Sequence, residues 1–126
     1  MERSGILELR KKIRKREKYA ILTDEITKAW SGLSVKQYKN HKGLKKENLR
    51  DNMSNLELVL NMLAEATTTE ISKEKKPKTF VENKKIANQG GTIAGNTRKE
   101  IEAKTGKIIV NKLNASDHLN NKKELE

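Results

Sequence analysis

The sequence predicts a mostly α-helical protein: a small multi-helix domain with a basic N-terminal helical arm and a disordered C-terminal tail. Three observations indicate this fold class. Apolar residues recur at helical spacing in several segments. Serine and threonine residues stand where they would cap helices, and glycines stand where helices would end. Only 33% of the residues are hydrophobic and 3% aromatic, against 36% charged, so the expected core is small.

The expected organisation has three parts. Residues 1–18 form the basic arm, and residues 19–106 form the helical domain, with a linker expected at 72–79. Residues 107–126 form a short extension and a flexible tail. The length of 126 residues allows one modest domain or a fragment of a larger one.

Charge is the strongest bulk property of the chain. A net charge of +11 favours binding to polyanions such as nucleic acid, although the same excess of lysine and arginine also occurs on basic surfaces without a dedicated partner. The absence of cysteine excludes disulfides and thiolate metal sites. No segment resembles a signal peptide and no apolar run reaches membrane length, so we expect a cytoplasmic protein with no membrane partner.

The N-terminal arm combines a thin apolar stripe with many basic residues. Ile6, Leu9 and Ile13 fall at helical spacing, and residues 1–18 hold eight basic and three acidic side chains. This pattern is typical of a nucleic-acid-binding arm, of a helix on a membrane surface, or of a solvated helix whose stripe packs on the next segment. The membrane alternative is the weakest, because no aromatic residue precedes Tyr19.

The segment after the arm carries signals for a new helix. Thr23 is suited to be its N-cap, followed by acidic residues in the first turn, and Gly32 is suited to end it. Ser34 and Gln37 then have the spacing of a capping box that opens a second, short helix.

Two helices joined by a glycine-containing turn suggest a DNA-binding helix-turn-helix. The pattern fits poorly, because Thr27 and Lys28, which would pack the two helices together, are polar. We therefore interpret Trp30 and Tyr38 as residues of a small core.

The most strongly predicted helix spans residues 55–71. Ser54 and Glu57 form a capping box in front of it, and the helix is expected to fray near the threonines before Ile71. Helix formation is expected to resume after Pro77. The helix is apolar over much of its circumference, so it would lie at the centre of the core, or a second copy of the chain would complete it. Its expected packing face consists of Leu56, Val59, Leu60, Leu63 and Ala66, widened by Leu58 and Met62.

No catalytic constellation is recognisable. His41 and His118 are far apart and have no ligand-like neighbours, so we interpret both as surface residues. Carboxylates such as Glu57 are explained as helix-surface or capping groups. The expectation is therefore a protein that is not an enzyme and has no cofactor and no metal site.

The glycine-rich segment at residues 88–107 allows several interpretations. It lacks the spacing of a phosphate-binding P-loop and of a dinucleotide-binding fingerprint, which disfavours a nucleotide site. Gly90 and Gly91 would instead open a helix that Gly106 ends, and free N–H groups at that start could meet a phosphate together with Arg98 and Lys99. Alternatively, the glycines form a hinge or allow close helix packing, with Gly95 at the contact. The expected packing face of this helix consists of Ile93, Thr97 and Ile101.

The last part of the chain begins with an apolar triplet, Ile108–Val110, which predicts a short strand or a packed extension. The polar residues from 114 to 126 are expected to be disordered.

A long stretch of the chain resembles a known family. The runs that carry the resemblance are AILTDEITKAWSGLSVKQYK, GLKKENLRDNMSNLELVLNMLAEATTTEISKEKKPKTF and NKKIANQGGTIAGNTRKEIEAKTGKIIVNKLNA. They are similar to the carboxy-terminal half of the bacterial DNA damage-inducible protein D family, whose members are similar to phage antirepressors with an upstream BRO-type domain. The resemblance covers about residues 19–115; residues 1–18 do not resemble the family, and the sequence contains no BRO-type domain.

The resemblance implies a role in the response to DNA damage or in prophage regulation, without enzymatic activity. The expected partner is DNA, bound without sequence specificity, or a DNA-acting protein. Alternatives are a protein–protein interaction module, a truncated remnant without activity, and a homodimer. The candidate phosphate contacts are Arg10, Lys11, Arg14, Lys15, Arg98 and Lys99.

Overall fold

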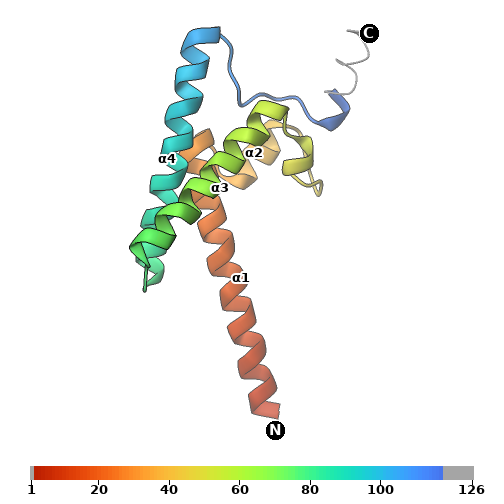
Figure 1. Cartoon of the computed structure of the whole chain (residues 1–126). Helices are drawn as coiled ribbons and strands as arrows, with labels where there is room; N and C mark the ends of the chain where they lie inside the picture. Colours follow the sequence, from red (N-terminus) through yellow and green to blue (C-terminus); the bar gives the residue numbers. More distant parts are fainter. Residues whose placement is uncertain (1, 118–126) are drawn as a thin grey trace.

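The computed structural model describes residues 2–117, and within them the chain is helical, with no strand (Figure 1). The predicted mostly α-helical fold is confirmed. Four α-helices and one short 3₁₀ helix follow one another along the described chain: α1 Glu2–Ser31, α2 Val35–His41, η1 Arg50–Asn52, α3 Asn55–Lys75 and α4 Phe80–Thr105.

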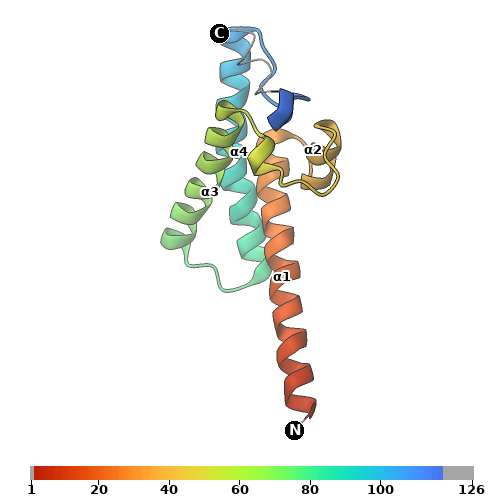
Figure 2. The same cartoon turned by 90° about the vertical axis from the view of Figure 1, so that its right-hand side faces the viewer.

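Helix α1 is a single 30-residue rod, so the predicted helix start at Thr23 is wrong. Thr23 lies inside the helix, where its carbonyl accepts a 2.9 Å hydrogen bond from the Thr27 hydroxyl. No glycine or proline interrupts residues 6–31, so nothing forces a break between the arm and the domain. The N-terminal half of α1 projects away from the other helices in both views (Figures 1 and 2).

The predicted caps at the connection between α1 and α2 are confirmed. Gly32 follows the last residue of α1 with a φ of 83°, a left-handed conformation that glycine adopts without strain. Ser34 caps α2: its hydroxyl accepts from the Gln37 N–H at 3.1 Å, and its own N–H donates to the Gln37 side chain at 3.0 Å. Asp24 of α1 adds an unpredicted third contact, accepting from the Val35 N–H at 2.7 Å.

Helix α3 begins at the predicted capping box but runs four residues further than expected. The Thr67 and Thr69 hydroxyls donate to the carbonyls of Leu63 and Glu65, which satisfies them within the helix and lets it continue. The helix ends at Lys76, whose φ of 47° is left-handed. The connection is therefore residues 76–79, shorter than the predicted linker at 72–79.

The predicted packing face of α3 is only partly correct. Leu60 is buried and Leu63 is partly buried, but the buried face also contains Glu57, Asn61 and Ala64. Leu56, Val59 and Met62 remain 39%, 57% and 50% exposed. Helix α3 is also not the centre of the bundle, because α4 is the helix that packs against both α1 and α3 (Figure 2).

Glycines allow α4 to lie between its two neighbours. A Cβ atom added to Gly91 would lie 2.6 Å from the Ala29 Cβ, and one added to Gly95 would lie 2.7 Å from the Ala29 carbonyl oxygen. A Cβ at Gly90 would collide with Thr68 of α3 instead. The prediction of close packing is confirmed, and each glycine is the residue type that this approach requires.

The predicted helix start at Gly90–Gly91 is wrong, because α4 begins ten residues earlier, at Phe80, behind the cap Thr79. The glycines lie mid-helix, where backbone N–H groups are used by the helix itself. They therefore present neither a hinge nor a free helix start to a phosphate. Gly106 ends α4 with a φ of 71°, as predicted. The packing face of α4 also differs from prediction, since Ile93 is 46% exposed.

The small core centres on the two predicted aromatic residues. Trp30 and Tyr38 have no exposed surface, and their ring centroids lie 6.0 Å apart at 58°. The Trp30 indole N–H donates to the Asn61 side chain at 3.1 Å, so the buried ring keeps its hydrogen bond.

The segment after α4 returns across the bundle toward α2 (Figure 1). Ile109 and Val110 are buried without forming a strand, which confirms the packed extension. The expected disorder from residue 114 onward is wrong for Asn114 and Ala115, which form hydrogen bonds to Lys42 and Asn52 of the body. Residues 118–126, with His118 and the rest of the predicted tail, lie outside the described residues.

Candidate nucleic-acid interface

The four predicted phosphate contacts of the arm are exposed. Arg10 and Arg14 lie one turn apart on α1, as do Lys11 and Lys15, so the four form two adjacent rows. Within the described residues their only ion pair is the loose 3.8 Å contact between Lys11 and Glu8. Four cationic groups are therefore available to a ligand.

The apolar stripe of the arm is also exposed. Ile6, Leu9 and Ile13 are 51%, 58% and 45% accessible, so the stripe does not pack on the segment that follows, contrary to that alternative. The arm meets the rest of the molecule near Lys18, whose ammonium lies 5.7 Å from the centre of the Phe80 ring. Residues before Lys18 can therefore be approached from all sides (Figures 1 and 2).

Arg98 occupies a different environment from the arm residues. Its side chain is only 16% exposed, and it donates to the Trp30 carbonyl and to Glu102, each at 2.7 Å. The Trp30 carbonyl belongs to the last turn of α1, where backbone acceptors have no partner in the helix. Glu102 in turn accepts from the Ile109 N–H at 2.9 Å. Arg98 thus joins the end of α1, α4 and the extension.

Lys99 is exposed, but the structure does not bring it close to the arm. Its neighbour Arg98 contacts Trp30, and Trp30 lies about 22 Å along α1 from Lys15 at the rise of an α-helix. The six predicted contacts therefore separate into an arm cluster of four, an internal arginine and a distant lysine.

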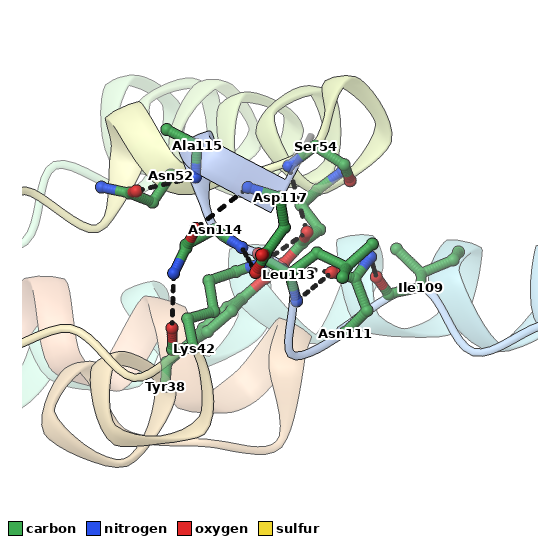
Figure 3. Close-up of polar contacts among 11 residues, drawn as sticks. Tyr38, Lys42, Asn52, Ser54, Ile109, Asn111, Leu113, Asn114, Ala115 and Asp117 are labelled. Atoms are coloured by element: carbon green, nitrogen blue, oxygen red, sulfur yellow. Dashed lines mark hydrogen bonds and ion pairs between the residues drawn. The ribbon is translucent and has the colours of Figure 1, made fainter. Parts of the chain in front are cut away.

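A buried polar cluster that the sequence did not predict joins α2, α3 and the extension (Figure 3). Glu57 accepts from the Tyr38 hydroxyl and from the Lys42 ammonium, the latter at 2.9 Å, and its side chain has no exposed surface. The same carboxylate accepts from the Ser54 N–H at 3.0 Å, so it serves as the capping partner as well. The signals in the sequence were the capping box and the four-residue spacing between Tyr38 in α2 and Lys42 at its C-terminal end, which places the two on the same side.

Lys42 connects this cluster to the extension. Besides Glu57, its ammonium donates to the Asn111 side chain at 3.3 Å and to the Leu113 carbonyl at 2.6 Å. An ammonium has three protons, and three acceptors are present. Further contacts join the Asn114 side chain to the Lys42 carbonyl and the Ala115 N–H to the Asn52 side chain (Figure 3).

The electrostatics of the buried cluster favour a role in stabilising the fold over a role in ligand binding or catalysis. Burial, and then the hydrogen bond and negative charge of Glu57, raise the pKa of the Tyr38 hydroxyl above its ordinary value. Tyr38 therefore stays protonated as a donor. With every donor of Lys42 satisfied and no exposed surface, the cluster leaves no group directed at a ligand.

The described residues offer neither a cluster for a metal ion nor a helix that could span a membrane. Over residues 2–117, no group of three or more histidine and acidic side chains is placed to hold a metal ion. None of the helices in the described chain combines the length and the apolar character needed to cross a bilayer.

Fold and surface together define a small helical protein with an exposed, strongly basic helical arm. Comparison with protein-family models, curated proteins and solved structures gave no match to the chain. The resemblance to the damage-inducible protein D family therefore stays a prediction.

Proposed function

We propose that this chain is a non-enzymatic nucleic-acid-binding protein whose arm contacts the phosphate backbone of DNA. The observation that carries the proposal is the exposure of Arg10, Lys11, Arg14 and Lys15 on a helix that projects from the body. A projecting helix can approach a nucleic-acid backbone without a clash from the rest of the molecule. The excess positive charge of the whole chain, +11, would steer it toward the polyanion.

The expected binding is independent of sequence. Lysine and arginine side chains that neutralise phosphates release counterions, which supplies affinity that falls steeply with salt. Half to two-thirds of protein–DNA hydrogen bonds go to phosphate and sugar oxygens, and such contacts carry no sequence information. Contact with the backbone is therefore the mode proposed for these side chains.

The biological setting is proposed from the resemblance. Residues 19–115 are similar to the carboxy-terminal half of the damage-inducible protein D family, which implies a role in the response to DNA damage or in prophage regulation. We propose the cytoplasm as its location. The basic arm lies outside that resemblance. It would add a DNA contact to a body that otherwise acts on DNA or on a DNA-acting protein.

The test compares two variants with equal loss of charge. In the first, Arg10, Lys11, Arg14 and Lys15 are replaced by glutamine; in the second, Lys99, Lys104, Lys107 and Lys112 are replaced instead. Fluorescence anisotropy with labelled DNA at low salt measures affinity. The arm variant is expected to lose about 10³-fold or more, given four phosphate contacts, and the second variant much less. Equal losses would show that net charge alone determines binding, and no binding by the unaltered chain would refute the proposal.

A second candidate function is protein–protein interaction, favoured by the exposed apolar residues of α3. Leu56, Val59 and Met62 are exposed apolar side chains spaced by three residues along α3, in a chain with 36% charged residues. A second copy of the chain could cover them, with Glu65, the next residue of the row, at the edge of the contact. Sedimentation at several concentrations tests for a dimer, which Val59→Lys would dissociate. If the chain is a monomer at all concentrations, the dimer is excluded, and the second candidate function would require a different protein as the partner of these side chains.

A further inference from the structure

A groove lies where the arm joins the body, between α1 and α2. It has a volume of about 750 Å³ and is open to solvent. Ile21, Val35 and Leu44 contribute apolar surface to its lining. Tyr19 stands at its edge with 74% of its surface exposed, in a chain whose other large aromatic side chains are buried or partly buried.

The charged side chains of the groove are mostly basic. Lys36, Lys39 and Lys45 line it, and none of them forms an ion pair with another described residue. The acidic side chain in the lining, Asp24, accepts a 2.7 Å hydrogen bond from the Val35 N–H. The groove therefore favours an anionic ligand.

The groove continues the basic surface of the arm. Lys15 and Arg16 precede Tyr19 by four and three residues, so they lie one turn away on the same face of α1. Both are exposed. A path of cationic groups thus runs along the arm, passes Tyr19 and reaches the lysines of the groove.

We propose that this groove binds single-stranded nucleic acid, with a base stacked on Tyr19 and its flanking phosphates on Lys36, Lys39 and Lys45. An exposed aromatic ring inside a basic track is the arrangement that proteins use for single strands, because every base offers a face for stacking. In a duplex, the bases are stacked on one another and do not reach such a ring. The inference rests on the proposed function, and it names the form of nucleic acid that the chain prefers.

The test measures two ligands with matched variants. Fluorescence anisotropy compares an oligothymidine of about 12 nucleotides with a duplex of the same length at the same low salt. Tyr19→Ala is expected to weaken single-strand binding about tenfold, the loss of one stacked base, and to change duplex binding by less than about twofold. Tyr19→Phe keeps the ring and is expected to bind like the unaltered protein. Because Tyr19 is exposed, thermal unfolding should be the same for all three proteins.

A direct readout locates the contact. An oligonucleotide with 5-iodouracil, cross-linked by light, should attach to the tryptic peptide that begins at Tyr19, and Tyr19→Ala should abolish this product.

The outcomes separate the two proposals. If the arm variant weakens both ligands while Tyr19→Ala leaves the preference between them unchanged, the DNA-binding function stands and the single-strand inference is refuted. If neither ligand binds at low salt, both proposals fail, and the groove would remain as a site for an acidic peptide.

Discussion

Glu57 of α3 and Lys42, the residue that follows α2, form an ion pair of 2.9 Å with neither side chain exposed to solvent. The pair stands where three parts of the chain meet, because Lys42 also holds the extension through Asn111 and Leu113. Both partners lose their hydration on folding, and the contacts around them compensate for that loss. Replacing either Glu57 or Lys42 alone would therefore lower the free energy of unfolding.

Glu57→Gln is expected to lower the free energy of unfolding by about 3–5 kcal/mol, because the Lys42 ammonium would stay buried without a countercharge. Urea denaturation followed by circular dichroism measures this loss. Arg50→Gln is the control, since the pair between Arg50 and Glu65 is 49% and 46% exposed and is worth at most about 1 kcal/mol. Similar losses in the two variants would contradict the role assigned to the buried pair.

Stability at high pH is expected to depend on Tyr38. Burial raises the pKa of its hydroxyl in the folded state, so its contribution is complete below the ordinary tyrosine pKa of about 10 and is lost as the pH rises further. One tyrosine proton accounts for up to about 1.4 kcal/mol per pH unit above that point. Tyr38→Phe should start from lower stability, because Glu57 loses a donor, but should decline less steeply above pH 10. The measurement is chemical denaturation of both proteins at several pH values. If the free energy of unfolding falls equally steeply above pH 10 in the two proteins, the prediction is contradicted.

Gly91→Ala tests the close approach of α4 to α1. Alanine would favour the helix by about 1 kcal/mol, but its methyl group would lie 2.6 Å from the Ala29 Cβ, and such overpacking costs about 1–3 kcal/mol. A net loss of stability is expected in thermal unfolding. Gly5→Ala is the control, because nothing lies within 4 Å of a Cβ at that position. Stabilisation by Gly91→Ala would show that the helices do not approach as closely.

Deletion of residues 1–15 tests the independence of the body from the arm. The described side chains of residues 5–15 are exposed, so the free energy of unfolding should change by no more than about 0.5 kcal/mol. The helical signal in circular dichroism should fall, because the deleted residues belong to α1. A large loss of stability would show that the exposed stripe at Ile6, Leu9 and Ile13 packs in solution.

The sequence predicted the features that depend on local chemistry. The capping boxes at Ser34 and Ser54 are confirmed because each is satisfied by a residue three positions away. Gly32 and Gly106 end helices because the left-handed conformation is determined by the residue itself. The aromatic residues Trp30 and Tyr38 were predicted to be buried since the chain has few alternatives for its core.

Several features that depend on tertiary packing were not predicted, although close packing at Gly95 was among the predicted alternatives. The face of α3 that is buried depends on the position of α4, and periodicity alone selected Leu56 and Val59 instead of Glu57 and Asn61. Gly90 and Gly91 were assigned to a helix start because glycine disfavours helix interiors, but contact with α3 and α1 outweighs that preference. In the candidate site, the arm residues were placed correctly on an exposed helix, whereas the internal position of Arg98 depends on its contact with Trp30, 68 positions away.

The most direct test of the central claim is the salt dependence of DNA binding by the unaltered chain and by the arm variant with glutamine at positions 10, 11, 14 and 15. If the four side chains contact phosphates, the slope of log affinity against log salt should become less steep by about 3 to 4 in the variant. Identical slopes for the two proteins would contradict the proposal that the arm is the nucleic-acid interface.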